Sequence, residues 1–179
     1  RAPRLLWAEL RDRRTFNELL FECFAGTSED RLMVLADDTF NWAMKQALYE
    51  GARDLIKRSK AEGHEVVLIS GALDFLLERL AKEIGADTWI GNRLEIKDNY
   101  ATGKILRPVV AGPTKARLIV DHARERGHDL SECFAYSDSY SDVPMLSVVG
   151  RPAAVNPDAA LLRLARAYSW PIVRFDREK

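Results

Sequence analysis

The chain has 179 residues, and its 27 Lys and Arg residues balance its 27 Asp and Glu residues, so the formal net charge is zero. This balance argues against nucleic acid or an anionic membrane surface as the main partner, and no apolar run approaches the length of a membrane span. The length fits one domain with a substantial core. The two cysteines, Cys23 and Cys133, form no Cys-x-x-Cys pair, and this usage predicts a reducing, cytoplasmic setting.

The first 50 residues or so have helical spacing throughout. Gly26 is expected to end one helix, and Thr27-Ser28-Glu29-Asp30 has the pattern of a helix start. The block predicts a helical cap subdomain over residues 1–49, although a plain helical hairpin packed on a sheet fits the pattern equally well. We interpret Asp37-Asp38-Thr39 as a solvated helix face, because no buried strand precedes it. The repeating apolar positions include Leu5, Leu6, Leu10, Phe16, Leu19 and Leu20.

From Gly51 onward, helical stretches alternate with short β-branched runs. This alternation predicts an α/β core over residues 50–179, with a Rossmann-like parallel sheet and helices on both faces. The predicted helices cover residues 52–62, 73–84, 115–126 and a last stretch begun by Pro157-Asp158. The predicted strands cover residues 65–72, 86–90, a run from Cys133, 153–155 and a tail at 171–175, with a hairpin between 94–97 and 103–106.

The stretch from Cys133 to Leu146 is the most informative. It begins as a short apolar run and then breaks into small polar residues, with Asp138 and Asp142 four positions apart and Pro144 suited to the first turn of a helix. In an open parallel sheet, ligands bind at the carboxyl ends of the strands. Two carboxylates there repel each other unless a cation or proton lies between them, and Mg²⁺ is the natural occupant. The alternative is an N-cap Asp and a surface Asp in an ordinary loop.

Two further polar signals are expected at the same edge of the sheet. Ser70, with the amides of Gly71 and Ala72, follows a predicted strand and opens a helix, which favours an anion site, although Ser70 could also be a simple N-cap. Lys115 lies in the first turn of a predicted helix, where the helix dipole opposes a cation. We therefore expect a carboxylate or a phosphate to hold it, the alternative being an ordinary exposed lysine.

Together, the hydroxyl, amides, ammonium and paired carboxylates fit phosphoryl transfer with Mg²⁺ on a small phosphorylated metabolite. Lys115 and Ser70 are the catalytic candidates in this chain, Ser70, Gly71 and Lys115 the substrate-binding ones, and Asp138 and Asp142 the metal ligands. The nucleophile is missing from this set.

These motifs resemble the haloacid dehalogenase (HAD) superfamily of phosphatases, and within it the phosphoserine-phosphatase-like subclass that has a helical cap. The resemblance covers about residues 15–176 and rests on Ser70-Gly71, Lys115, the stretch 136–146 and the segments 149–158 and Trp170-Pro171-Ile172.

The resemblance implies a role for each matching position. Asp138 would ligate Mg²⁺, and Asp142 would ligate it or orient its water. Lys115 would steady the nucleophile and the transferring phosphoryl group. Ser70 and the Gly71 amide would bind phosphate oxygens.

The family's first motif, Asp-x-Asp-x-Thr/Val, is absent from the chain. Its first Asp is the nucleophile that becomes an aspartyl-phosphate, its second is the general acid and base, and Asp37-Asp38-Thr39 has neither the spacing nor the setting. Because the family places this strand before the cap, we expect it upstream of Arg1. We also expect the chain as written to be inactive, with unpaired edges on the neighbours of the absent central strand.

Two other readings stay open. The chain could be a non-catalytic HAD-like phosphate-binding protein that has lost the nucleophile. A phosphoacceptor signalling domain uses similar residues, but the helical block ahead of the first strand argues against it. Phosphoserine phosphatases usually carry an Arg in the first cap helix, and residues 16–26 contain none, which lowers the odds for phosphoserine.

Overall fold

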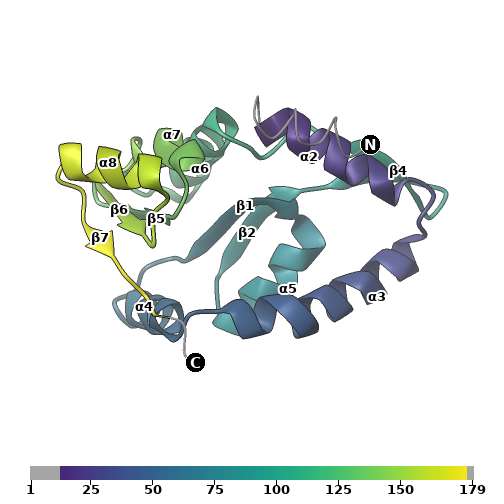
Figure 1. The fold of residues 1–179 in the computed structure, drawn as a ribbon, viewed down its shortest axis with the longest axis horizontal. Coiled ribbons are helices and arrows are strands. Elements are labelled where there is room, and N and C mark those ends of the chain that lie inside the picture. The colour runs from purple at the N-terminus through teal and green to yellow at the C-terminus, as the bar shows by residue number, and fades with distance from the viewer. Residues whose placement is uncertain (1–12, 177–179) are drawn as a thin grey trace. The chain divides into compact units, whose positions relative to one another are not determined.

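A computed structural model describes residues 13–176 of the chain (Figure 1). The helical prediction around Leu5, Leu6 and Leu10 lies outside the described residues. By compactness the chain divides after Val110, and the second unit runs from Ala111 to Asp176. The predicted division into a cap over residues 1–49 and a core over 50–179 was based on where the helical pattern gives way to alternating strands and helices. That division stays a prediction.

The first unit begins with helices, as the spacing predicts. Helix α2 (Arg13–Phe21) continues into a 3₁₀ turn, and helix α3 (Glu29–Thr39) starts at Ser28, whose Oγ accepts a hydrogen bond from the Arg31 amide at 3.3 Å. This confirms the capping pattern. Helix α3 passes into a π-helical turn (Phe40–Met44) and a 3₁₀ turn (Lys45–Ala47). Asp37 is exposed on α3 and pairs with Arg79, which agrees with a solvated helix face.

A β-α-β unit follows helix α4 (Glu50–Ala61). Strands β1 (Val67–Leu73) and β2 (Thr88–Asn92) pair in parallel, and helix α5 (Asp74–Ile84) between them packs against both strands (Figure 1). Leu77 and Ala81, four residues apart on α5, are both buried, because residues at this spacing share one face of a helix.

The predicted hairpin is formed by β3 (Leu94–Lys97) and β4 (Tyr100–Ile105), which pair antiparallel. Its loop is Asp98-Asn99, and both residues have positive φ. A two-residue type I′ turn requires this, and its backbone twist matches the right-handed twist of the two strands. The loop therefore lies earlier than the predicted residues 99–102. The hairpin contributes to a buried cluster made by Phe21, Leu32, Leu73, Leu94 and Ala101.

The second unit is a parallel α/β layer whose strands lie in the order β5-β6-β7. Leu146, Ala154 and Leu161 are fully buried residues of this unit. Its elements are α6 (Pro113–Arg126), β5 (Phe134–Ser137), the 3₁₀ turn η4 (Tyr140–Asp142), α7 (Val143–Leu146), β6 (Arg151–Val155), α8 (Ala159–Ala167) and β7 (Ile172–Val173).

The predicted α/β class with parallel strands is confirmed. Within the described residues the strands form separate sheets, so that β1 pairs only with β2, and β5 only with β6. One edge of β1 and one edge of β5 therefore carry no strand partner in residues 13–176.

Asp87 links the end of α4 to the start of β1, and this link predicts a pH dependence of stability. The Lys60 ammonium and the Val66 amide, both hydrogen-bonded to the Asp87 carboxylate, lower its pKa. A group whose pKa is lowered on folding stabilises the fold above its unfolded pKa of about 3.9, and this contribution is lost as the pH falls through the folded pKa. Asp87→Asn should lower the thermal midpoint near about pH 6 and have a shrinking effect towards about pH 3. A constant effect across that range would contradict the assignment.

Gly150 precedes β6 where the chain passes close to the loop before β5, and this contact predicts a large effect of a single methyl group. Its amide donates to the Leu130 carbonyl at 2.8 Å, and an added Cβ would lie 1.8 Å from the Ser131 carbonyl oxygen. Backbone atoms cannot move aside cheaply, so Gly150→Ala should reduce the free energy of unfolding by about 3 kcal/mol or more, measured by urea denaturation.

Gly127→Ala is the matched control in the same unit. It has a φ of +73° but no atom within 4 Å of the added Cβ, so only the left-handed backbone cost of about 1–2 kcal/mol is expected. Equal losses in the two variants would show that the contact at Gly150 is relieved by local movement.

Candidate active site

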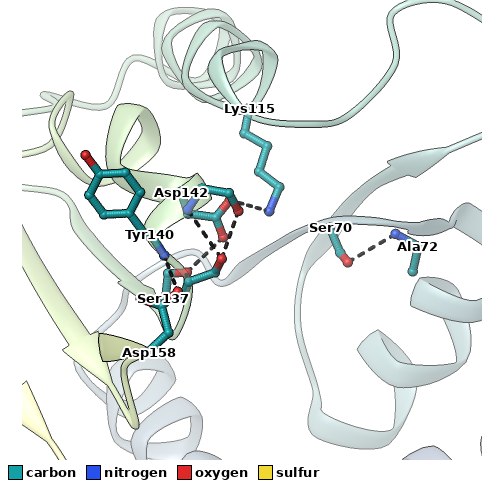
Figure 2. Close-up of polar contacts among 9 residues, drawn as sticks. Ser70, Ala72, Lys115, Ser137, Tyr140, Asp142 and Asp158 are labelled. Atoms are coloured by element: carbon teal, nitrogen blue, oxygen red, sulfur yellow. Dashed lines mark hydrogen bonds and ion pairs between the residues drawn. The ribbon is translucent and has the colours of Figure 1, made fainter. Parts of the chain in front are cut away.

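A buried ion pair lies beside the carboxyl end of β5 in the second unit (Figure 2). The Lys115 Nζ lies 2.7 Å from the Asp142 Oδ1, and the two side chains are only 12% and 11% exposed. The Ser137 hydroxyl donates to the other carboxylate oxygen of Asp142 at 2.8 Å. The described residues thus give the Asp142 carboxylate one cationic and one neutral donor.

The local sequence explains why Lys115 needs this partner. Pro113 begins helix α6, and Lys115 lies in its first turn, where free amides and the helix dipole disfavour a positive charge. The expectation that a carboxylate or phosphate holds Lys115 is confirmed for the carboxylate. An ordinary exposed lysine is excluded by the burial of the pair.

Asp138 directly follows β5, and its side chain is exposed. Its carbonyl accepts a hydrogen bond from the Asp158 amide at 2.8 Å, so the backbone at this exposed position is held. Asp138 and Asp142 therefore differ in setting: the first carboxylate is exposed, and the second is buried and paired.

Asp158 holds the loop between β5 and α7, a role that the sequence pattern did not reveal. One carboxylate oxygen caps helix α8 by accepting from the Leu161 amide, and the other accepts from the Tyr140 amide, each at 2.8 Å (Figure 2). Burial alone would raise its pKa, but hydrogen bonds from these amides and that of Ala160 hold the pKa of Asp158 below its usual value. The pair Pro157-Asp158 indicated a helix start, but nothing in the sequence indicated the hydrogen bond from the Tyr140 amide.

Ser137 is a second residue that the sequence analysis did not single out. Besides donating to Asp142, its Oγ accepts a hydrogen bond from the Ser139 amide at 3.2 Å. The hydroxyl therefore joins the Asp142 carboxylate to the turn that follows Asp138. The run of serines around Asp138 is the only sequence signal for this role.

Ser70 and Gly71 lie in the first unit, in the last part of β1. The Ser70 Oγ accepts a hydrogen bond from the Ala72 amide at 3.2 Å, and the N-cap position of α5 belongs to Leu73 (Figure 2). Ser70 is therefore not the N-cap of this helix. Lys115, Asp138 and Asp142 belong to the second unit, so the convergence of Ser70 with them stays a prediction.

The donor set at the end of β5 fits a hard divalent cation. Mg²⁺ commonly takes one or two carboxylates from a protein and fills its other positions with water and substrate phosphate. Asp138 and Asp142 are the two carboxylates at this strand end, and both oxygens of Asp142 already accept hydrogen bonds, from Lys115 and from Ser137. Residues 13–176 hold no cluster of three or more His, Cys, Asp or Glu side chains that could bind a metal ion by themselves, and none of their helices is long and apolar enough to cross a membrane.

The buried pair yields a prediction about stability. Lys115→Ala leaves the Asp142 carboxylate buried without its counter-charge, so we expect the free energy of unfolding to fall by about 3 kcal/mol, measured by urea denaturation. Lys115→Ala combined with Asp142→Ala should recover part of this loss, since the double variant leaves no unpaired charge. Arg124→Ala is the control on the same helix, because that side chain is 75% exposed in its pair with Asp121. Equal effects of Lys115→Ala and Arg124→Ala would contradict the assignment.

Comparison with known proteins gives matches along most of the chain. The family model described as haloacid dehalogenase-like hydrolase matches residues 1–147. The chain is 38% identical over 152 residues to the "Inhibition of morphological differentiation protein" of Streptomyces azureus, covering 85% of this chain and 55% of that protein. It is 35% identical over 150 residues to "Phosphoserine phosphatase SerB1" of Mycobacterium tuberculosis, covering 84% of this chain and 49% of that protein. The chain thus spans about half the length of these curated relatives.

Among solved structures, that of a probable phosphoserine phosphatase from Vibrio cholerae superposes with a TM-score of 0.76, at 20% identity, covering 96% of this chain and 51% of that one. This likeness concerns the fold, and it agrees with the predicted α/β class. The family model covers well over half of the chain, including Ser70, Lys115, Asp138 and Asp142. The chain belongs to the haloacid dehalogenase-like hydrolases.

Proposed function

We propose that the chain carries the greater part of the active site of a Mg²⁺-dependent phosphomonoester hydrolase. The observation that supports this most strongly is the nearly buried Lys115–Asp142 pair, together with the exposed residue Asp138 that directly follows the parallel strand β5. A lysine and two carboxylates in this position suit phosphoryl transfer, whose catalysis depends on positioning and charge neutralisation. Membership of the hydrolase family supports the same reaction class.

In this proposal Asp138 and Asp142 hold the Mg²⁺, which when bound neutralises charge on the phosphoryl group. Lys115 lies with its ammonium on Asp142, so its charge is positioned before substrate arrives. It steadies the nucleophile and the phosphoryl oxygens. Ser70 and the Gly71 amide bind phosphate oxygens, and they are the residues that the first unit contributes to the site.

We propose that the nucleophile comes from a strand outside these 179 residues, because the chain contains no Asp-x-Asp. The first Asp of that motif would attack phosphorus to form an aspartyl-phosphate, while the second would give a proton to the leaving alcohol and later take one from the hydrolytic water. The free edges of β1 and β5 in the described residues support a missing neighbour strand. On its own, the 179-residue chain should therefore not turn over substrate.

The proposed substrate is a small phosphorylated metabolite, which the name of the mycobacterial relative supports. Residues 16–26 contain no Arg to grip a substrate carboxylate, so we favour a phosphomonoester other than phosphoserine. Cys23 and Cys133 are both free thiols, which fits the reducing conditions of the cytoplasm.

Hydrolysis of a generic aryl phosphate by the whole protein, Asp-x-Asp strand included, tests this proposal. We expect activity that requires Mg²⁺ and that falls by about 100-fold or more in Asp138→Ala, because a metal ligand is lost. Asp121→Asn is the matched control, since this exposed carboxylate lies on the outside of helix α6 in a surface pair.

Activity that survives Asp138→Ala would overturn the metal assignment. Turnover by the 179-residue chain alone would overturn the proposed source of the nucleophile. A whole protein that binds phosphate without hydrolysing the ester would favour the non-catalytic alternative.

A further inference from the structure

The segment that carries Ser70 is a bulge in strand β1. Ile69 pairs with Ile90 on β2, and the next pair joins Leu73 to Asn92. Four steps along β1 thus face only two steps along β2, and the residues between Ile69 and Leu73 leave the regular ladder. Bulges of this kind re-aim side chains but leave backbone groups without ladder partners, so something else must satisfy them.

The side chain of Asn92 forms a hydrogen bond with the backbone of the bulge. Asn92 is fully buried, its Nδ2 donates to the Gly71 carbonyl at 2.8 Å, and its Oδ1 accepts from the Val110 amide at 2.7 Å. A buried amide is tolerated only when its polar atoms are bonded, and here both ends bond to backbone. Asn92 thereby ties the bulge to Val110, the residue at which the first unit ends.

This bond also orients the peptide that holds Ser70. The Gly71 carbonyl and the Ala72 N–H belong to one planar peptide group and point to opposite sides of the chain. Fixing the carbonyl on Asn92 therefore aims the Ala72 N–H the other way, where the Ser70 Oγ accepts it at 3.2 Å.

The opposite side of Gly71 is equally restricted. A Cβ added there would lie 2.7 Å from the Nδ2 of Asn17 on helix α2 and 3.2 Å from the Val110 carbonyl. The Gly71 peptide is thus enclosed by α2 and the segment at Val110, and it is bonded to β2.

We propose that Asn92 is a positioning residue for the phosphate-binding turn at Ser70 and Gly71. It is fully buried and therefore acts without touching a ligand, by setting the direction of the Gly71–Ala72 peptide and hence of the Ser70 hydroxyl. The inference rests on the proposed role of this turn in binding phosphate.

Titration of the purified whole protein with inorganic phosphate, followed calorimetrically in the presence of Mg²⁺, tests this inference without turnover. Asn92→Leu removes both hydrogen bonds while keeping the branching of the side chain, and Asn92→Ser is a second, smaller variant. Each should weaken phosphate affinity by roughly tenfold or more, the usual effect of removing a supporting residue behind a site. Ser70→Ala should also weaken it.

Leu32→Ala is the control for a purely structural effect, because Leu32 is nearly fully buried in the core of the same unit. It should lower the thermal midpoint and leave phosphate affinity unchanged. Unaltered affinity in folded Asn92 variants, or unfolding of both under conditions where Leu32→Ala stays folded, would overturn the inference and leave the proposed function standing. Absence of phosphate binding in the unsubstituted protein, or full binding by Ser70→Ala, would instead overturn the phosphate role of the turn itself, and the inference with it.

Discussion

The ion pair between Lys115 and Asp142 is the interaction on which the candidate site depends. A lysine in the first turn of a helix is opposed by the helix dipole, and a carboxylate that is nearly buried is costly unless it is paired. The Asp142 carboxylate offsets the unfavourable helix dipole at Lys115, and the Lys115 ammonium offsets the cost of burying the Asp142 carboxylate. Next to this pair, the Ser137 hydroxyl and the Asp158 carboxylate accept hydrogen bonds from the amides of the two residues that follow Asp138. The backbone around Asp138 is thereby fixed, while Asp138 itself is exposed.

Both candidate binding segments arise where a parallel strand stops being regular. Strand β5 ends at Ser137 and passes into a 3₁₀ turn, whereas β1 bulges at Ser70–Ala72 before helix α5 begins. In each case side chains take over the hydrogen bonds that the sheet no longer supplies, through Asp158 in one unit and Asn92 in the other.

The sequence was sufficient to predict most of the helices and strands and the need of Lys115 for a partner, but not the hydrogen bonds that hold the strand ends. Periodicity located helices such as α5 and the hairpin, and Lys115 could be assigned a carboxylate partner because its helix position demanded one. Asn92 gave no signal, since an Asn near a strand end is common and its partners are backbone atoms far along the chain. The alternative that Ser70 is an N-cap was wrong, because Ser70 still belongs to strand β1 and Leu73 holds the N-cap position of α5.

We propose that Ser70, Lys115 and the two carboxylates serve one phosphoryl site. The most direct measurement is a crystal structure of the whole protein with Mg²⁺ and a beryllium fluoride mimic of the phosphoryl group. The account predicts the cation about 2.1 Å from an Asp138 oxygen, with Lys115 and Ser70 both within hydrogen-bonding distance of the anion. A cation bound elsewhere, or an anion contacted by neither Lys115 nor Ser70, would contradict it.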